Sequence, residues 1–199
     1  QRVHLAQRRR REAGARIATR TPVRALRVED GLWIVSLGDG FRDVAARAVV
    51  NAAGPWVGDV ARLGTSSGAR SADVRLVRGS HIVVPRIAGG NDAYTLQNSD
   101  GRVVFVLPFE SDFTLIGTTE QPQGRDPRSV SVSSDEESYL LTAVNRYLRV
   151  PIKPEQIVWT FAGVRPLDDD GSDNVSAITR DYRLDLQSEG TPPILNVIG

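Results

Sequence analysis

The sequence predicts a fold of the mixed α+β / α/β class, in which short β-strands dominate and a few helices flank the sheets. Three observations indicate it. Apolar and polar residues alternate between residues 22 and 50, a dense series of strand-like segments follows residue 73, and one clear helical repeat spans residues 134–148. The 199 residues leave room for one large core or two smaller lobes.

The N-terminal residues predict a helix followed by a short strand. Residues 3–13 suit a helix that Gly14 would end, and residues 15–19 are strand-like. The helix carries a run of arginines, Arg8–Arg11. Such a run is either a basic docking patch or, more commonly, the solvated face of a helix.

A three-stranded meander is predicted next. Residues 23–28 and 32–37 alternate apolar and polar side chains on either side of Glu29-Asp30-Gly31, which is a hairpin signal. A second turn at residues 38–40 leads to an apolar strand over residues 44–50.

The meander ends in small residues. Residues 52–54 are Ala-Ala-Gly, so nothing larger than a methyl group would keep a ligand from the backbone. Ligands of open α/β sheets bind at such carboxyl ends of strands, whereas the alternative is a tight turn with Trp56 packed in the core. A short helix over residues 57–63 and a Gly/Ser-rich connector over residues 64–71 follow.

The middle of the chain is rich in strands and contains one helix. Asn-Ser-Asp-Gly at residues 98–101 is a hairpin turn. The helix over residues 134–148 takes Ser134 as its N-cap and Glu137 as the partner in a capping box, and Pro151 follows its end. The predicted strands cover residues 74–77, 81–85, 93–97, 103–107 and 113–117.

Two arginines near the C-terminal end predict a site for a small anion. Arg165 ends a strand-like run over residues 158–164 that should stop at Pro166, and Arg180 begins a second run after an Asp-rich turn. Guanidinium groups grip phosphate or carboxylate with paired hydrogen bonds, so two of them brought together by a hairpin would bind such a group. The alternative is that both form surface ion pairs with the neighbouring aspartates.

Composition excludes several classes of function. The formal net charge is +1, so no long-range field would attract nucleic acid. The chain has no cysteine and only two histidines, which excludes thiol chemistry and leaves little material for a metal site. No apolar run is long enough to span a bilayer, and no signal peptide is visible. The abrupt ends at Gln1 and Gly199 predict a piece of a longer protein.

Five motifs, taken in order, carry a resemblance to a known family. They are Ala-Arg-Ala-Val-Val-Asn-Ala-Ala-Gly-Pro-Trp-Val (46–57), Gly-Ser-His-Ile-Val-Val-Pro-Arg (79–86), Leu-Ile-Gly-Thr-Thr-Glu (115–120), Val-Trp-Thr-Phe-Ala-Gly-Val-Arg-Pro-Leu (158–167) and Ala-Ile-Thr-Arg-Asp-Tyr (177–182). Together they closely resemble the FAD-dependent glycerol-3-phosphate dehydrogenases of the aerobic, respiratory type, within the glycine/D-amino-acid oxidase-like flavoproteins. The resemblance covers nearly the whole chain.

The resemblance implies a partial FAD-binding, Rossmann-like domain joined to an antiparallel substrate-binding sheet flanked by helices. The expected boundaries are 1–72 for the FAD-binding part, 73–165 for the substrate-binding sheet, and 166–199 for a hairpin and strand that return to the first part. The family's Gly-x-Gly-x-x-Gly motif and its Gly-rich, Lys-containing segment do not occur in this sequence. The chain alone is therefore expected to be inactive.

The resemblance also implies a reaction. It is the oxidation of sn-glycerol 3-phosphate to dihydroxyacetone phosphate by hydride transfer from C2 to FAD, with the electrons passed on to a quinone. Arg180 would bind the phosphate and Arg165 the C2 oxygen, while His81 would accept the hydroxyl proton. The other expected site residues are Thr118 and Thr119 as hydroxyl donors to the substrate, and Ala53, Gly54 and Gly199 against the flavin.

Peripheral docking at the cytoplasmic face of the inner membrane, or a cytoplasmic location, follows from the same resemblance, and a homodimer is compatible with it. Two alternatives stay open. The same fold could oxidise an amino acid or a 2-hydroxy acid, for which one arginine on the carboxylate would suffice. The chain could instead be a non-catalytic module that binds an anion.

Overall fold

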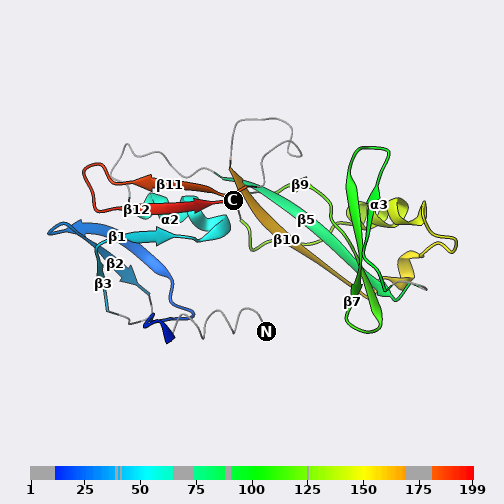
Figure 1. Ribbon diagram of the computed structural model, residues 1–199, viewed down its shortest axis with the longest axis horizontal. Helices are drawn as coiled ribbons and strands as arrows, with labels where there is room; N and C mark the ends of the chain where they lie inside the picture. The colour runs from blue at the N-terminus through cyan, green and yellow to red at the C-terminus, as the bar shows by residue number, and fades with distance from the viewer. Residues whose placement is uncertain are drawn as a thin grey trace. The chain divides into compact units, whose positions relative to one another are not determined.

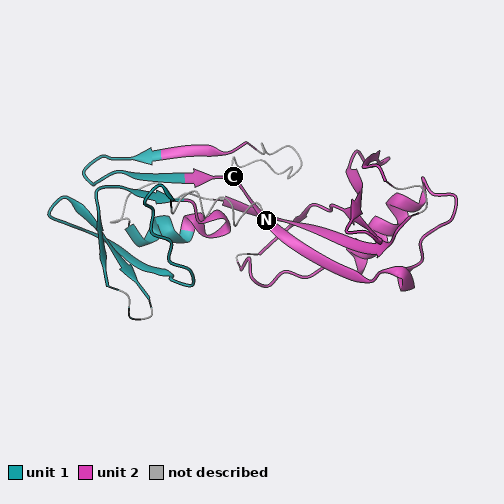
Figure 2. Cartoon of the chain, turned by 60° about the horizontal axis from the view of Figure 1, so that its bottom comes forward, with its two compact units in different colours: residues 1–51, 59–71, 186–196 teal, residues 52–58, 72–185, 197–199 magenta. Residues whose placement is uncertain are grey.

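The computed structural model describes residues 12–38, 40, 42–64, 74–87, 91–124, 126–168 and 181–199 (Figure 1). The chain forms two compact units (Figure 2), the first from residues 1–51, 59–71 and 186–196 and the second from residues 52–58, 72–185 and 197–199. Each unit therefore combines segments that are distant in the sequence. The three-part division expected above stays a prediction, and the helix predicted over 3–13 lies almost wholly outside the described residues, as does Arg8–Arg11.

The first unit contains the predicted meander. Strands β1 (Val23–Glu29), β2 (Leu32–Leu37) and β3 (Val44–Ala46) pair antiparallel in that order. The turn between β1 and β2 places Asp30 and Gly31 at φ angles of 49° and 75°, which these two residue types tolerate better than most others. The turn residues read from the sequence therefore act as expected.

Trp33 is the centre of the first unit's core. Its side chain is 1% exposed and packs with Leu26 and Ile194. The indole Nε1 donates a hydrogen bond of 3.0 Å to the carbonyl oxygen of Pro192. The large ring is thus buried without leaving its one polar group unsatisfied.

A second three-stranded sheet has the order β11-β12-β4. Strand β12 (Ile194–Ile198) runs parallel to β4 (Val49–Asn51), and β11 (Arg183–Gln187) lies on its other side. The buried side chains of Asn51 and Asn196 are joined by a hydrogen bond of 2.8 Å from Nδ2 to Oδ1. A parallel pair of this kind is typical of α/β sheets.

Two strand predictions for this part of the chain are wrong. The sequence predicts a single strand over residues 44–50, whereas β3 and β4 are separate strands in different sheets, because the chain leaves the strand conformation at Arg47 and Ala48. Residues 15–18 form no strand, and none of the described strands pairs with them. An unpaired strand would leave its backbone hydrogen bonds unmade.

Small residues connect β4 to the helical segment, as the sequence predicts. The chain passes through the 3-10 turn η1 (Gly54–Trp56) into helix α2 (Val57–Gly64). Trp56 is 41% exposed, so the small residues do not serve to seat this ring in a core.

The second unit is built on a larger sheet with the order β10-β5-β8-β7-β6, and the short β9 also pairs with β5. All these pairings are antiparallel. The predicted turn at residues 98–101 joins β6 to β7, with the Gly101 amide donating to the Asn98 carbonyl over 3.0 Å. The strands are β5 (Val74–Pro85), β6 (Tyr94–Gln97), β7 (Val103–Phe109), β8 (Phe113–Gly117), β9 (Gln121–Pro122) and β10 (Trp159–Asp168).

Two strands of this sheet are longer than the sequence predicts. Strand β5 is continuous where two strands, 74–77 and 81–85, are expected, since β10 pairs with Gly79 as it does with its neighbours. Strand β10 does not stop at Pro166 but continues to Asp168. It is an edge strand, where a proline can be accommodated without losing a ladder hydrogen bond.

Helix α3 (Ser134–Asn145) packs on one face of this sheet. It ends earlier than predicted, and its N-cap is Ser133 with Glu136 as the capping-box partner, one residue before the predicted pair Ser134 and Glu137. Both pairs fit the sequence rule, but Glu136 shares the buried stripe of the helix with Leu140 and Val144. No helix among the described residues combines the length and apolar character needed to cross a bilayer.

The larger sheet has two chemically different faces, because side chains alternate along each strand. We call the side against α3 the helix face. Its core contains Ile82, Val84, Val104, Val106 and Ile116, all buried. We call the other side the glycine face, because Gly79, Gly117 and Gly163 lie on it, together with His81, Phe161 and Arg165.

Candidate functional site

Arg165 and Thr118 meet above Gly79 on the glycine face. A Cβ atom added to Gly79 would lie 2.7 Å from Arg165 Nη1 and 3.2 Å from its Cζ, and it would also overlap Thr118 Oγ1. The glycine therefore leaves the space into which both polar groups project. Gly163 lies directly opposite Gly79 on β10, and no atom of the described residues comes within 4 Å of a Cβ built on it. This part of the face is bare backbone.

His81 lies two residues beyond Gly79 on the same strand, roughly 7 Å along it. Its imidazole covers Gly117, where an added Cβ would lie 2.9 Å from Nε2. The ring also stacks on Phe161 with 4.8 Å between centroids and 6° between planes. A glycine on one side and an aromatic ring on the other thus fix the position of the imidazole.

Two nitrogen atoms of this cluster could still form a hydrogen bond with a ligand. His81 Nδ1 and Arg165 Nη1 are both buried and have no hydrogen-bond partner among the described residues. Buried polar groups in proteins are nearly always hydrogen-bonded, so such a pair on one face indicates a place for a polar ligand.

Burial lowers the pKa of His81 below its ordinary value of 6.5, and the positive charge of Arg165 lowers this pKa further. The imidazole is therefore neutral at neutral pH and can accept a proton. A neutral base beside a permanent cation suits removal of a proton from an oxygen on which negative charge develops.

The two threonines after β8 take different places. Thr118 lies at the glycine face, where its hydroxyl donates to the Thr119 carbonyl oxygen over 3.2 Å. Thr119 is 1% exposed, and its hydroxyl donates to Glu136 Oε1 over 2.7 Å. The single hydroxyl proton of Thr119 is therefore used inside the protein, whereas Thr118 is the threonine that reaches the site cluster.

Glu136 is a buried residue near the site that the sequence did not identify. Burial raises the pKa of its carboxyl group, but hydrogen bonds from the Ser133 backbone and the Thr119 and Ser80 hydroxyls outweigh this and lower the pKa. The signal was present in the sequence, since Glu136 precedes Leu140 and Val144 at intervals of four residues on the buried stripe.

The residues predicted to lie against a cofactor are small and leave backbone exposed to approach. Ala53 precedes η1, which contacts β10, the strand of Arg165. Gly54 has a φ angle of 56°, and within the described ranges no atom lies within 4 Å of a Cβ built on it. Gly199, at φ 118°, packs against the backbone of Asp181 and Tyr182. These features suit the close approach of a flat ring to bare backbone.

Arg180 lies outside the described residues, so its predicted phosphate contact stays a prediction. An ion pair with Asp168 would give Arg165 a purely structural role, but Asp168 is paired with a different arginine. Asp168 instead accepts two hydrogen bonds from Arg183, of 2.7 and 2.9 Å.

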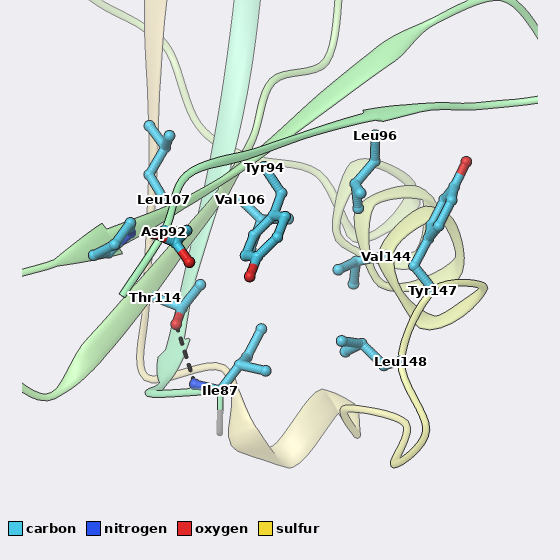
Figure 3. A pocket seen from close by; sticks show the side chains of 11 residues that line it. Ile87, Asp92, Tyr94, Leu96, Val106, Leu107, Thr114, Val144, Tyr147 and Leu148 are labelled. Atoms are coloured by element: carbon cyan, nitrogen blue, oxygen red, sulfur yellow. Dashed lines mark hydrogen bonds between the residues drawn. The ribbon is translucent and has the colours of Figure 1, made fainter. Parts of the chain in front are cut away.

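A separate pocket of about 350 Å³ opens where β6, β7 and β8 meet α3 (Figure 3). Its lining is mostly apolar, with Leu96, Val106 and Val144 among the lining residues, and the Thr114 hydroxyl accepts a hydrogen bond of 3.2 Å from the Ile87 amide. None of the predicted site residues lines it.

Comparison with known proteins agrees with the family resemblance that the sequence motifs indicate. A family model described as FAD dependent oxidoreductase matches residues 2–186. The chain is 47% identical to D-erythritol 1-phosphate dehydrogenase of Brucella abortus, over 94% of this chain and 38% of that protein. It is 45% identical to glycerol-3-phosphate dehydrogenase of Pseudomonas aeruginosa, over 95% of this chain and 38% of that protein. The chain thus spans well under half the length of these relatives.

Solved structures share the fold. The glycerol-3-phosphate dehydrogenase of Bacillus halodurans, complexed with FAD, aligns with a TM-score of 0.69 at 25% identity, covering 88% of this chain and 34% of that one. The L-α-glycerophosphate oxidase of Mycoplasma pneumoniae aligns with a TM-score of 0.69 at 19% identity, over 94% of this chain and 46% of that one. The predicted class, a partial FAD-binding domain joined to an antiparallel sheet, is thereby confirmed.

Proposed function

The chain belongs to the family of FAD-dependent oxidoreductases, and from this premise we propose that the protein oxidises the secondary hydroxyl of a short polyol phosphate, with sn-glycerol 3-phosphate as the first candidate. The product would be the ketone, dihydroxyacetone phosphate. The observation that carries this proposal is a pair of buried nitrogens on the glycine face, His81 Nδ1 and Arg165 Nη1, for which the described residues supply no hydrogen-bond partner.

FAD is the cofactor of the family, and the residues present suit it. The backbone around Gly54 is open to a flat ring, and η1 contacts the strand that carries Arg165. Ala53, Gly54 and Gly199 would hold this part of the cofactor. When bound, FAD accepts the hydride that leaves the alcohol carbon.

The side chains of the site would accept the hydroxyl proton of the substrate and stabilise the negative charge that develops on its oxygen. Neutral His81 would accept the hydroxyl proton at Nδ1, so that the C–H electron pair leaves as hydride and the alcohol becomes a ketone. Arg165 Nη1 would donate to the same oxygen and stabilise its developing charge. Thr118, whose hydroxyl lies beside Arg165, would orient the substrate, and Arg180 is our candidate for the phosphate fork.

A four-carbon substrate is the second candidate, because a relative at 47% identity is named D-erythritol 1-phosphate dehydrogenase. The bare backbone at Gly163 gives a reason for considering the longer substrate, since none of the residues that the structure describes has an atom within 4 Å of its Cβ position. We also propose a quinone as electron acceptor, reached by peripheral attachment to the membrane, as the resemblance implies.

The test is anaerobic reduction of the flavin in the full-length, FAD-loaded protein. The substrate panel is sn-glycerol 3-phosphate, D-erythritol 1-phosphate, glycerol, a D-amino acid and a 2-hydroxy acid, and the loss of the oxidised flavin absorbance is followed. We expect one or both phosphate esters to reduce the flavin at least about 100-fold faster than glycerol, because the phosphate supplies binding energy that glycerol lacks.

Each other outcome is equally informative. Faster reduction by the four-carbon ester would select the second candidate. Reduction by the amino acid or hydroxy acid alone would retain the fold and overturn the phosphate ester as substrate. No reduction by any of the five would favour a non-catalytic anion-binding module.

A further inference from the structure

We propose that Glu136, on the helix face, is a positioning residue for the site on the glycine face. The proposal rests on the proposed function, because it concerns the placement of His81, Arg165 and Thr118. Glu136 does not belong to that cluster, and its side chain is 3% exposed.

One carboxylate oxygen of Glu136 serves its helix. Oε2 accepts hydrogen bonds of 3.0 Å from the backbone amide and 3.0 Å from the hydroxyl of Ser133, while the Ser133 hydroxyl accepts from the Glu136 amide over 3.3 Å. This is a complete capping box, and it needs nothing from the other oxygen.

The other carboxylate oxygen serves the sheet. Oε1 accepts hydrogen bonds from the hydroxyl of Ser80 over 2.8 Å and of Thr119 over 2.7 Å. The Thr119 hydroxyl in turn accepts from the Ser80 amide over 3.0 Å. Arg78, also on β5, contacts both oxygens: its Nε donates to Oε1 over 3.3 Å, and its Nη2 forms an ion pair of 2.8 Å with Oε2. Glu136 therefore fastens β5 to the end of β8.

The fastened residues are the immediate neighbours of the site residues. Ser80 lies between Gly79 and His81 on β5, and Thr119 directly follows Thr118. Because side chains alternate across a strand, a contact that holds Ser80 from the helix face also fixes the backbone from which His81 projects on the other side. Glu136 thus holds β5 and the end of β8 from the helix face, at the point where both carry residues of the candidate site. We call these contacts of Glu136 with Arg78, Ser80 and Thr119 the brace.

A charged carboxylate satisfies the donors around Glu136 better than a neutral amide would. Ser80 and Thr119 donate to Oε1, Ser133 donates to Oε2, and Arg78 contacts both oxygens. A carboxylate offers two acceptor oxygens, whereas a glutamine offers only one and would present its NH2 group to donors on the other side. Glu136→Gln must therefore weaken the brace in either orientation of its amide, because it loses the charge that pairs with Arg78 of β5 and turns an NH2 group toward donors.

Four variants of the full-length, FAD-loaded protein test the proposal. Glu136→Gln and Thr119→Val weaken the brace, whereas Thr119→Ser keeps the hydroxyl at residue 119. Ser133→Ala is the matched control, since it removes a cap side chain on the Oε2 side and leaves the contacts of Oε1 to Ser80 and Thr119. Thermal unfolding, kcat and KM for the reducing phosphate ester, and the pH profile of kcat/KM are measured for each variant.

We expect Glu136→Gln and Thr119→Val to lower kcat/KM about 10- to 100-fold, because small misplacements of reacting groups are costly. They should also shift the apparent pKa on the acid side of the pH profile, which reports His81. Thr119→Ser should recover to within about threefold of the starting enzyme, and Ser133→Ala should stay within about twofold at a comparable loss of thermal stability.

The proposal is overturned if the brace variants lose no more kcat/KM than Ser133→Ala, or if the pH profile stays in place. Binding of inorganic phosphate, followed by the change in absorbance of the oxidised flavin, gives a readout without turnover. A starting enzyme that neither binds phosphate nor reacts with either phosphate ester would instead remove the proposed function and the positioning role together. The two failures are therefore distinguishable.

Discussion

The two faces of the larger sheet are formed by alternate residues of the same strands, yet they differ in whether their buried polar groups are hydrogen-bonded within the described structure. On the helix face, Ser80 and Thr119 are 0% and 1% exposed, and the hydroxyl groups of both donate hydrogen bonds to Glu136. On the glycine face, buried nitrogens of His81 and Arg165 have no partner among the described residues. Hydrogen bonds left unmade in a folded protein cost stability, and a ligand can make them.

This difference teaches where stability and chemistry are located. The helix face contains a close-packed apolar core and a satisfied polar group, so changes there should act mainly on folding unless they reach the brace. The glycine face contains glycines, aromatic rings and nitrogens of His81 and Arg165 that lack a hydrogen-bond partner in the described part of the chain, so changes there should act mainly on binding and turnover. The predictions below test that division.

Arg165→Ala should have the largest effect. Removing the guanidinium takes away the donor for the charge that develops on the substrate oxygen, and such losses lower rates by about 10²- to 10³-fold. Steady-state kcat/KM with the reducing phosphate ester measures it, and thermal unfolding should change little. A loss below about tenfold would mean that Arg165 does not touch the reacting oxygen.

Gly79→Ala should have the next largest effect, and Gly163→Ala is its matched control. A methyl group at Gly79 would overlap Thr118 Oγ1 and lie 2.7 Å from Arg165 Nη1, whereas the Cβ position at Gly163 has no neighbour within 4 Å in the described part of the chain. We expect kcat/KM for sn-glycerol 3-phosphate to fall about 100-fold for the first and less than about threefold for the second. Equal losses in the two variants would contradict the placement of Arg165 above Gly79.

The pH dependence should show a smaller effect. The pKa of His81 is lowered below 6.5, so kcat/KM should hold at neutral pH and fall about tenfold for each pH unit below that lowered pKa, as the base is protonated. The unfolded chain binds this proton more readily than the folded protein, so His81 also makes the protein less stable as pH falls below about 6.5. In His81→Gln the acid limb should disappear, and a limb that persists would assign it to another group.

Much of the strand pattern follows from the sequence, and the departures have local causes. Alternation and turn residues place β1, β2 and β8 within a residue or two, since these strands are bounded by clear turns. The sequence fails at Gly79 and Pro166, where a helix- or strand-breaking residue lies inside a strand. There tertiary pairing with a long neighbour overrides the local preference.

The site could be predicted only in part. His81, Thr118 and Arg165 come from motifs, and the structure brings these three together above Gly79 and Gly117. The helical spacing could have indicated that Glu136 is buried, but its contacts with the sheet and the roles of Gly79 and Gly117 could not be predicted, because they depend on which face each residue occupies. Two overlapping Ser-x-x-Glu matches begin at Ser133 and Ser134, and only packing decides between them.

Pro166 has a consequence for how the protein meets other copies of itself. Its partner across the ladder is Leu76, whose carbonyl oxygen accepts from Gln123 on the side away from β10. The pair is therefore of the kind that exchanges no hydrogen bonds, and the nitrogen of Pro166 points outward from the sheet. An approaching strand would find no donor there. The proline thus protects a ten-residue edge from intermolecular β-pairing, a safeguard against aggregation while the protein is being made.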